Sequence, residues 1–349
     1  MKKFLAMILT VALTLSLAAC GEQQASAPNP PVDSGKTEEP PVETVTLSFA
    51  HDKVETHPVH QAALRFKELV EEKTGGTVQI DIFPNQDLGS PTDVAEQVSL
   101  GTIDINVVSP GIMDKYSNKY YTVEMPFAFD NYDHAHKVLD GPFNEWVGDD
   151  LEEFGFHRLS NWEFGFRQLT SNTNIETVDD MNGLLIRTPS TDVLVSLFSA
   201  LGSNVQIINY SELYTSLKND VIDAEENPIA TIYADKLNEV QANLYLTNHY
   251  YDFTFMIINT GSWENKLNDE QREAVSEASK EAGDYCRELT QSMEDEYLEK
   301  LASAGMRIVD DLDLDAFRAK MTAAYNEIIE VVGQEYYDAF WDMVNENRV

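Results

Sequence analysis

Two arginines stand where apolar segments of the sequence end. Arg167 follows the aromatic segment 162–166, and Arg187 follows the apolar residues 184–186. A buried guanidinium group without an anionic partner costs several kcal/mol, so each must meet either an internal acid or an anionic ligand. A planar guanidinium forms two parallel hydrogen bonds with a carboxylate, so the second alternative predicts a site for a carboxylic acid. The residues alone leave both alternatives open.

A third candidate is Asn227, within the polar run 225–228 that ends in a proline. Acidic residues after a strand often only solvate a loop, and Asn followed by Pro also marks a turn. The functional interpretation is that Asn227 donates a hydrogen bond to a ligand oxygen at the end of a strand. Both interpretations stay open from the residues.

The histidines form two groups that resemble metal-binding pairs. His57 and His60 are three residues apart with His51 nearby, and His134 and His136 form a second pair. Zinc needs three or four converging ligands, and a spacing of three is common by chance. We therefore expect no metal and no other cofactor, and we place His51 and His57 in a polar loop that lines a cleft.

The motifs of the common catalytic classes are absent from the sequence. It has no glycine-rich phosphate loop before Lys-Ser or Lys-Thr, no Gly-x-Ser-x-Gly elbow, no His-Glu-x-x-His and no Cys-x-x-Cys. Cys286 lies in a charged helical pattern and is interpreted as an incidental helix residue rather than a nucleophile. The sequence therefore predicts a protein that is not an enzyme.

The elements that must position these residues alternate between strand and helix. The expected order is strand 45–50, helix 58–74, strand 78–82, helix 92–100 and strand 103–108. A similar series follows with strand 184–187, helix 192–201, strand 204–208, helix 211–218 and strand 221–224. This alternation predicts an α/β fold with two similar lobes and a ligand at the carboxyl ends of the strands.

Longer segments connect and cover the two lobes. The aromatic segment 154–169 and the apolar strand 250–259 would cross between them and form a hinge. A helix over 269–304 is far longer than the usual ~11 residues and could span both lobes. Residues 313–345 are again helical with a break near Gly333, and we expect them to pack on the outside.

The first residues resemble a bacterial lipoprotein signal. Two lysines precede the apolar run 4–17, and two alanines stand just before Cys20, as in a lipobox. The run is shorter than the ~20 residues of a membrane span, which favours cleavage. We expect residues 1–19 to be a signal peptide and 20–44 to be a lipidated cysteine with a flexible, proline-rich tether. The protein would be a lipoprotein held outside the cytoplasm, in the periplasm or on the outer face of the membrane.

Composition limits the class of partner. The formal net charge is −36, from 60 acidic and 24 basic residues. A protein this acidic does not bind nucleic acid through a general basic surface. Of the two cysteines, Cys20 is the expected lipid attachment site, so no disulfide within the chain is expected.

Several segments together resemble the solute receptors of tripartite ATP-independent periplasmic (TRAP) transporters, of the DctP type and in lipoprotein form. The most specific segments are 166–172, 181–189 and 223–228, and the weaker ones are 83–89, 101–104, 210–214 and 246–249. They span nearly the whole mature chain in order. The sequence departs from many relatives at Thr188, where they have Val, and at Ala224-Glu225, where they have Gly-Gln.

The resemblance implies a two-lobed clamshell like the class II periplasmic binding proteins, with hinge strands and a long helix across both lobes. Lobe 1 would comprise residues 45–165 and about 253–292, and lobe 2 residues 166–252 and about 293–349. It implies that Arg187 forms the main salt bridge to the solute carboxylate and that Arg167 and Asn227 also bind the solute. It further implies a small and a large membrane subunit as partners, driven by an ion gradient.

The polar first loop favours a uronate-like sugar acid as the ligand. His51 and Glu55 offer hydrogen-bonding groups there, and Trp162 could pack on a sugar face. Tyr210 and Ser109 complete the candidate ligand-binding residues. A C4-dicarboxylate or another organic acid of the same family remains the alternative.

Other classes remain open from the residues alone. A secreted two-lobe enzyme would need an acid–base pair in the cleft, such as Glu226 with a histidine. A sensor for a signalling partner is a further alternative, and a receptor that delivers a metal is a more distant one.

Overall fold

Residues 44–348 are described by a computed structural model, in which they contain one sheet of nine strands. The expected signal peptide, Cys20 and the tether lie outside the described residues. The strands are β1 Val45–Ala50, β2 Val78–Phe83, β3 Ile105–Val108, β4 Phe156–Ser171, β5 Leu185–Thr188, β6 Asn204–Ile207, β7 Ala224–Pro228, β8 Asn243–Asn259 and β9 Arg307–Val309.

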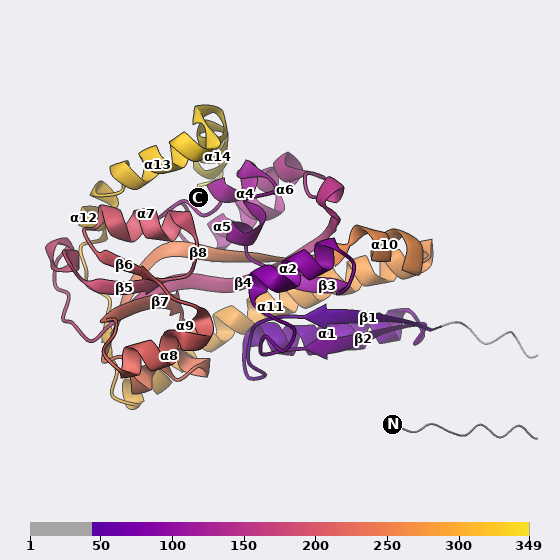
Figure 1. Cartoon of the computed structure of the whole chain (residues 1–349), viewed down its shortest axis with the longest axis horizontal. Helices are drawn as coiled ribbons and strands as arrows, with labels where there is room; N and C mark the ends of the chain where they lie inside the picture. Colours follow the sequence, from indigo (N-terminus) through magenta and orange to yellow (C-terminus); the bar gives the residue numbers. More distant parts are fainter. Residues whose placement is uncertain (1–43, 349) are drawn as a thin grey trace, which may run out of the picture. The chain divides into compact units, whose positions relative to one another are not determined.

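Helices connect the strands and cover both faces of the sheet (Figure 1). The α-helices are α1 Pro58–Lys73, α2 Pro91–Ser99, α3 Pro110–Met113, α4 Asn118–Thr122, α5 Tyr132–Asp140, α6 Pro142–Val147, α7 Asp192–Ala200, α8 Tyr210–Lys218, α9 Ile229–Ala234, α10 Thr260–Lys266, α11 Asp269–Ser303, α12 Leu314–Ala319, α13 Thr322–Val332 and α14 Gln334–Glu346. Three short 3₁₀ turns are η1 Glu152–Phe154, η2 Val178–Met181 and η3 Leu237–Glu239. None of the helices in residues 44–348 is long and apolar enough to span a bilayer.

The strand order divides the sheet into two parallel groups joined by two long strands. The order is β2-β1-β3-β8-β4-β7-β5-β6, with β9 beside β8. Strands β1, β2 and β3 pair in parallel, as do β5, β6 and β7. The antiparallel strands β4 and β8 run between the groups. The predicted α/β fold is confirmed, while the residue boundaries of the two lobes stay a prediction.

The long helix α11 begins at a capping box formed by Asn268 and Gln271, which supplies partners for backbone groups at its first turn. A stripe of small residues then lets it approach β4 closely. A Cβ atom at Gly283 would lie 2.4 Å from the Asn161 carbonyl oxygen, so this position requires glycine. Figure 1 shows α11 running past both groups of strands.

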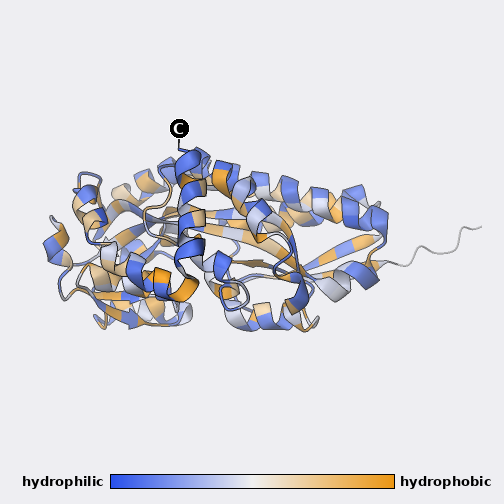
Figure 2. Cartoon of the chain, turned by 90° about the horizontal axis from the view of Figure 1, so that it is seen from above, coloured by the Kyte–Doolittle hydropathy of each residue, from blue (hydrophilic) through white to orange (hydrophobic). Residues whose placement is uncertain are grey.

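Hydrophobic residues concentrate along the strands and hydrophilic residues along the outer helices (Figure 2). One core under α1 and α11 contains Phe49, Phe66, Trp162 and Cys286, all with 0% exposure. Burial raises the pKa of the Cys286 thiol to about 12, and its Sγ lies 3.4 Å from the Glu163 carbonyl oxygen. This supports the interpretation of Cys286 as a packing residue.

The structure corrects several expected element boundaries. The strand expected at 221–224 is instead β7, Ala224–Pro228, so the polar run 225–228 lies inside the sheet. Strand β8 begins at Asn243 rather than at 250. Helix α8 begins at Tyr210 rather than at 211, and its N-cap is Asn209, which makes no side-chain capping bond.

Candidate functional site

A cavity of about 280 Å³ lies where strands of both parallel groups meet β4 and β8. Its lining includes five expected ligand-binding residues: Ser109, Arg167, Arg187, Tyr210 and Asn227. Two other hollows, of about 210 and 770 Å³, surround His157 and contain none of these five. The cavity is therefore the candidate functional site.

Arg187 reaches this cavity from β5 and is 3% exposed. Its Nε donates a hydrogen bond to the Ile208 carbonyl oxygen at 2.9 Å, and its guanidinium carbon lies 5.8 Å from the Tyr210 ring centroid. Within residues 44–348, no Asp or Glu forms an ion pair with it. Burial lowers the pKa of Arg187 to about 10. A buried cation in this state is stabilised by any anion that enters the cavity.

Arg167 lines the same cavity from β4 but is paired with acidic side chains. Its Nε pairs with the Glu226 carboxylate and its Nη1 with the Asp252 carboxylate. Its Nη2 donates to the Glu226 carbonyl oxygen at 2.7 Å and to Asn227 Oδ1 at 3.1 Å. Although burial opposes the charge, these acids raise the pKa of Arg167 above its usual value.

The acids of β7 are held by neighbours across the sheet. Glu225 accepts hydrogen bonds from Thr170 Oγ1, at 2.6 Å, and from Asn227 Nδ2. Burial raises the pKa of Glu225 to about 7. Burial also acts on Glu226, but the Arg167 guanidinium outweighs it and lowers the pKa of that carboxyl. The run 225–228 thus lies buried in the sheet rather than in a solvated loop, and its Asn227 lines the cavity.

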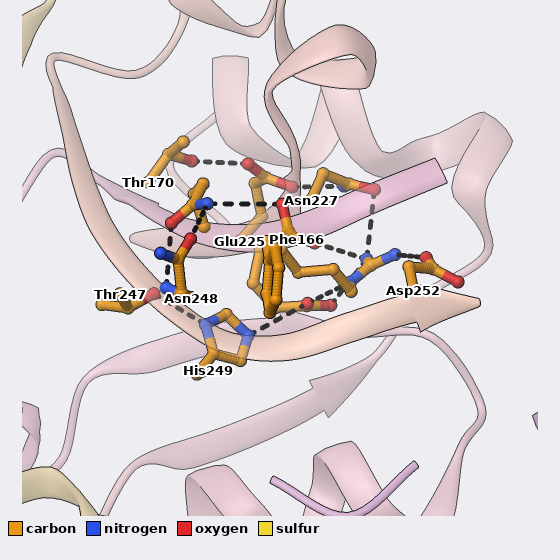
Figure 3. A network of polar contacts seen from close by, with 11 residues as sticks. Phe166, Thr170, Glu225, Asn227, Thr247, Asn248, His249 and Asp252 are labelled. Carbon is orange, nitrogen blue, oxygen red and sulfur yellow. Dashed lines mark hydrogen bonds and ion pairs between the residues drawn. The ribbon is translucent and has the colours of Figure 1, made fainter. Parts of the chain in front are cut away.

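His249 is the histidine nearest to this network. Its Nε2 lies 3.4 Å from Glu226 Oε2, and Thr247 lies next to its other ring nitrogen at 2.7 Å. Burial lowers the pKa of His249, so the ring is neutral near pH 7. Figure 3 shows the chain of contacts from Thr247 through His249 toward Asp252.

The first loop contributes a residue that the sequence interpretation missed. Lys53, 9% exposed, lines the cavity and pairs with Asp52 at 3.1 Å. Its Nζ lies 4.3 Å from the Phe164 ring centroid and 5.4 Å from that of Tyr210. The sequence indicates that the loop is polar, but the spacing of its residues does not distinguish Lys53 from its neighbours.

Glu124 and Tyr250 were also missed. Glu124, 2% exposed, lines the cavity, and Tyr250 Oη donates to its Oε1 at 3.0 Å. Burial, assisted by Asp114, raises the pKa of Glu124 to about 8. No motif surrounds this acid in the sequence, so only the tertiary structure reveals it.

Three expected ligand-binding residues do not line the cavity. Trp162 is fully buried in the core beside Phe49, which corrects the expectation that its ring packs on a sugar. His51 is buried and its Nε2 lies 3.2 Å from Nδ1 of His60. Glu55 is exposed on the loop. In the structure these three side chains face a core ring, a second histidine and solvent, respectively.

Histidines and acids do not gather into a metal centre in the described part of the chain, where no group of three or more could hold an ion. His57 Nε2 instead lies 3.2 Å from Thr231 Oγ1, which links the first loop to α9. His134 Nε2 lies 2.9 Å from the Val344 carbonyl oxygen. Each of these rings has a packing role.

Comparisons with known proteins agree with this architecture. The family model of the bacterial extracellular solute-binding proteins, family 7, matches residues 49–331. The chain is 32% identical to a 2,3-diketo-L-gulonate-binding periplasmic protein of Escherichia coli over 273 residues, which cover 78% of this chain and 83% of the relative. The chain is also 28% identical to a C4-dicarboxylate-binding periplasmic protein of Rhodobacter capsulatus over 297 residues, which cover 84% of this chain and 89% of the relative.

A solved structure gives the same result in three dimensions. The chain superposes with a TM-score of 0.81 on a TRAP periplasmic solute-binding protein of a Sulfitobacter species with bound β-D-galacturonate. The two are 28% identical, and the match covers 86% of this chain and 99% of the other. The two proteins therefore share their fold over most of the chain.

Proposed function

This chain belongs to family 7 of the bacterial extracellular solute-binding proteins, the TRAP-type receptors of small acids, and we propose from this premise that its cavity binds a hydroxylated sugar acid such as a uronate or an aldonate. The protein would capture the acid outside the cytoplasm and release it to a TRAP permease. Its role is binding without turnover.

The state of Arg187 is the observation that carries the proposal. This guanidinium is buried in the cavity wall, and only its Nε has a hydrogen-bond acceptor among residues 44–348. A carboxylate can accept two parallel hydrogen bonds from such a group. We therefore assign Arg187 the role of binding the ligand carboxylate.

Arg167 and Asn227 have supporting roles in this proposal. Arg167 fixes the Asn227 side chain through a hydrogen bond of 3.1 Å. Ser109 and Tyr210 line the same space and offer hydroxyl groups to the ligand. A ligand with several hydroxyls matches this set of donors and acceptors.

The named ligands of the relatives support sugar acids and keep one second candidate. The E. coli relative is named for 2,3-diketo-L-gulonate and the Sulfitobacter structure holds galacturonate, both oxygen-rich acids. The Rhodobacter relative is named for C4-dicarboxylates, and Lys53 is a second cation of the cavity that could meet another carboxylate. A C4-dicarboxylate is therefore the second candidate.

Delivery to the membrane is part of the proposal. We propose that the two membrane subunits of a TRAP transporter are the partners and that Cys20, if lipidated, keeps the receptor beside them. Radiolabelled palmitate or mass spectrometry of the mature N-terminus would test the anchor. A mature chain without a lipid on Cys20 would contradict it.

The test of the ligand class is thermal unfolding of residues 44–349 with a panel of acids. A ligand at 100 times its dissociation constant adds about 2.7 kcal/mol of stability, which raises Tm by several degrees. We expect such a shift with galacturonate, glucuronate or galactonate. A shift with succinate or malate alone would favour the second candidate, and no shift with any carboxylate would contradict the proposal.

A further inference from the structure

The charges that line the cavity are unevenly paired. The six charged residues are Asp52, Lys53, Glu124, Arg167, Arg187 and Asp252. Lys53 pairs with Asp52 at 3.1 Å, and Arg167 pairs with Asp252. Among the described residues, this leaves Arg187 as a cation without an acid and Glu124 as an acid without a cation.

Glu124 is held in place from three sides. Tyr250 of β8 donates to its Oε1, and its Oε2 has no hydrogen-bond partner in residues 44–348. A Cβ atom at Gly111 would lie 2.5 Å from Glu124 Oε1 and 2.8 Å from Thr191 Cγ2, so the backbone of α3 and the segment before α7 both approach the carboxyl group. Glycine at position 111 is what makes room for it.

Two further oxygens near this position also lack donors. Asp252 Oδ1 and Thr191 Oγ1 are buried without a hydrogen-bond partner in the described part of the chain. Both residues line the cavity together with Glu124. Buried polar atoms of native proteins are almost always paired, so this side of the cavity is built to meet hydrogen-bond donors.

The groups that face Glu124 keep it protonated near neutral pH. Burial raises its pKa to about 8, Asp114 after α3 and Asp252 of β8 act in the same direction, and the hydrogen bond from Tyr250 acts against them. The backbone N–H of Gly111 also acts against them, and no cation is among the largest causes of the shift. A protonated carboxyl group can donate one hydrogen bond and accept others, as a hydroxylated ligand requires.

We propose that Glu124 selects ligands by charge, so that the cavity accepts a single carboxylate at Arg187 with hydroxyl groups toward Glu124 and rejects acids that carry a second carboxylate. The inference rests on the proposed function and narrows it to monocarboxylates. A second carboxylate would have to be buried near Glu124 and Asp252 without a free cation among the described residues to pair with it, and a buried unpaired charge is costly. At higher pH, ionised Glu124 would add like-charge repulsion, which the interior screens poorly.

The test compares acids that differ only at one end. Galactonate and galactarate share their carbon chain and hydroxyls, but galactarate has a carboxylate at carbon 6; erythronate and meso-tartrate form a shorter pair. Isothermal titration at pH 7 should give a dissociation constant at least tenfold larger for the diacid of a pair. This ratio should rise from pH 6 to pH 9, because ionised Glu124 adds a negative charge.

The Glu124→Gln variant should lower the ratio at pH 9, where Glu124 of the parent is ionised, and should remove the pH dependence of the ratio, since a glutamine cannot ionise. Glu68→Gln on the exposed face of α1 is the matched control: it makes the same substitution at an acid that does not line the cavity, and the ratio should stay within about twofold. If Glu124→Gln does not fold, Tyr250→Phe replaces it. Loss of the Tyr250 hydrogen bond should move the midpoint of the pH dependence upward.

The outcomes separate this inference from the proposed function. If no acid of the panel binds, galacturonate and glucuronate included, the proposed function fails. If a monoacid binds but its diacid binds equally well, or if Glu124→Gln leaves the ratio unchanged at pH 9, the selection by Glu124 is refuted while a carboxylate receptor stands.

Discussion

Arg167 and Arg187 line the same cavity from neighbouring parts of one sheet, yet their guanidinium groups differ in what surrounds them. Arg167 contacts two carboxylates, a carbonyl oxygen and an amide oxygen, whereas Arg187 has one carbonyl acceptor in the described part of the chain. The pKa of Arg167 is raised by its acids, and that of Arg187 is lowered by burial.

The difference teaches that burial alone does not identify a binding arginine. Both residues follow apolar segments, and both alternatives, an internal acid or a ligand, were open for each from the sequence. In this structure Arg167 has the internal acids and Arg187 has room for a ligand. We therefore expect substitutions at the two positions to affect different measurements.

The largest effect should follow Arg167→Ala. It leaves Glu226 and Asp252 buried without their cation, which typically costs about 3–5 kcal/mol of the free energy of unfolding. Thermal denaturation should show Tm lower by roughly 5–15 °C. The control is Arg287→Ala, whose partner Asp140 is partly exposed, and it should lose less than half as much. Equal stability of Arg167→Ala and the parent chain would contradict the pairing seen here.

Arg187→Ala should instead abolish ligand binding while the protein stays folded. Loss of a buried charged partner weakens binding by about 2–5 kcal/mol, or roughly 30- to 5000-fold. Calorimetry with the best acid of the panel would measure it, with Arg65→Ala on the exposed face of α1 as the control. Unchanged affinity in Arg187→Ala would remove this residue from the site.

The Glu225→Gln variant should change how the stability of the protein depends on pH. The raised pKa of Glu225, about 7, means that the folded state holds its proton more tightly than the unfolded state does. Its contribution to stability is complete below about pH 4.5 and is lost as the pH rises through 7. The variant should therefore gain roughly 1–3 kcal/mol relative to the parent between pH 5 and pH 8, as measured by urea unfolding.

Glu226→Gln is the matched control for this pH effect. The pKa of Glu226 is lowered, so its contribution is present above the unfolded pKa and is lost as the pH falls. The variant should be destabilised most at neutral pH, the opposite trend. Parallel pH profiles for both variants would argue against the different environments described for the two acids.

The smallest effect expected is that of Arg187→Lys. Lysine keeps the positive charge but loses the planar fork that forms two parallel hydrogen bonds. Affinity should fall by roughly tenfold, about 1.4 kcal/mol, to a value between those of the parent and Arg187→Ala. Affinity equal to the parent would show that charge alone, and not the guanidinium geometry, holds the ligand.

Much of the fold was predictable because periodic apolar patterns and helix stops were present where elements exist. Strand Val45–Ala50 and helix Asp192–Ala200 lie within a residue of their expected bounds. Strand β7 was displaced because its residues 225–227 are charged or amide-bearing, which normally indicates a loop. Here Arg167 and Thr170 compensate that polarity across the sheet, and a local pattern does not contain this information.

The site was predictable only where local context marked a residue. Arg167, Arg187 and Asn227 stand at recognisable segment ends. Glu124 has no such mark, and its role depends on Gly111 and Tyr250, which are distant in sequence. Trp162 was misplaced because an aromatic residue near a site and one in the core look alike in sequence.

The burial of Cys286 makes the reactivity of its thiol a measure of local opening of the fold. Its side chain lies on the buried face of α11, and burial raises the pKa of the thiol to about 12. While α11 stays packed on the sheet, almost no thiolate is therefore available to an alkylating reagent. A cysteine introduced on the surface of residues 44–348 can therefore be labelled with a fluorophore or spin label while Cys286 stays unlabelled. The rate at which Cys286 is alkylated would report how often α11 separates from β4, and this rate can be compared with and without a bound acid.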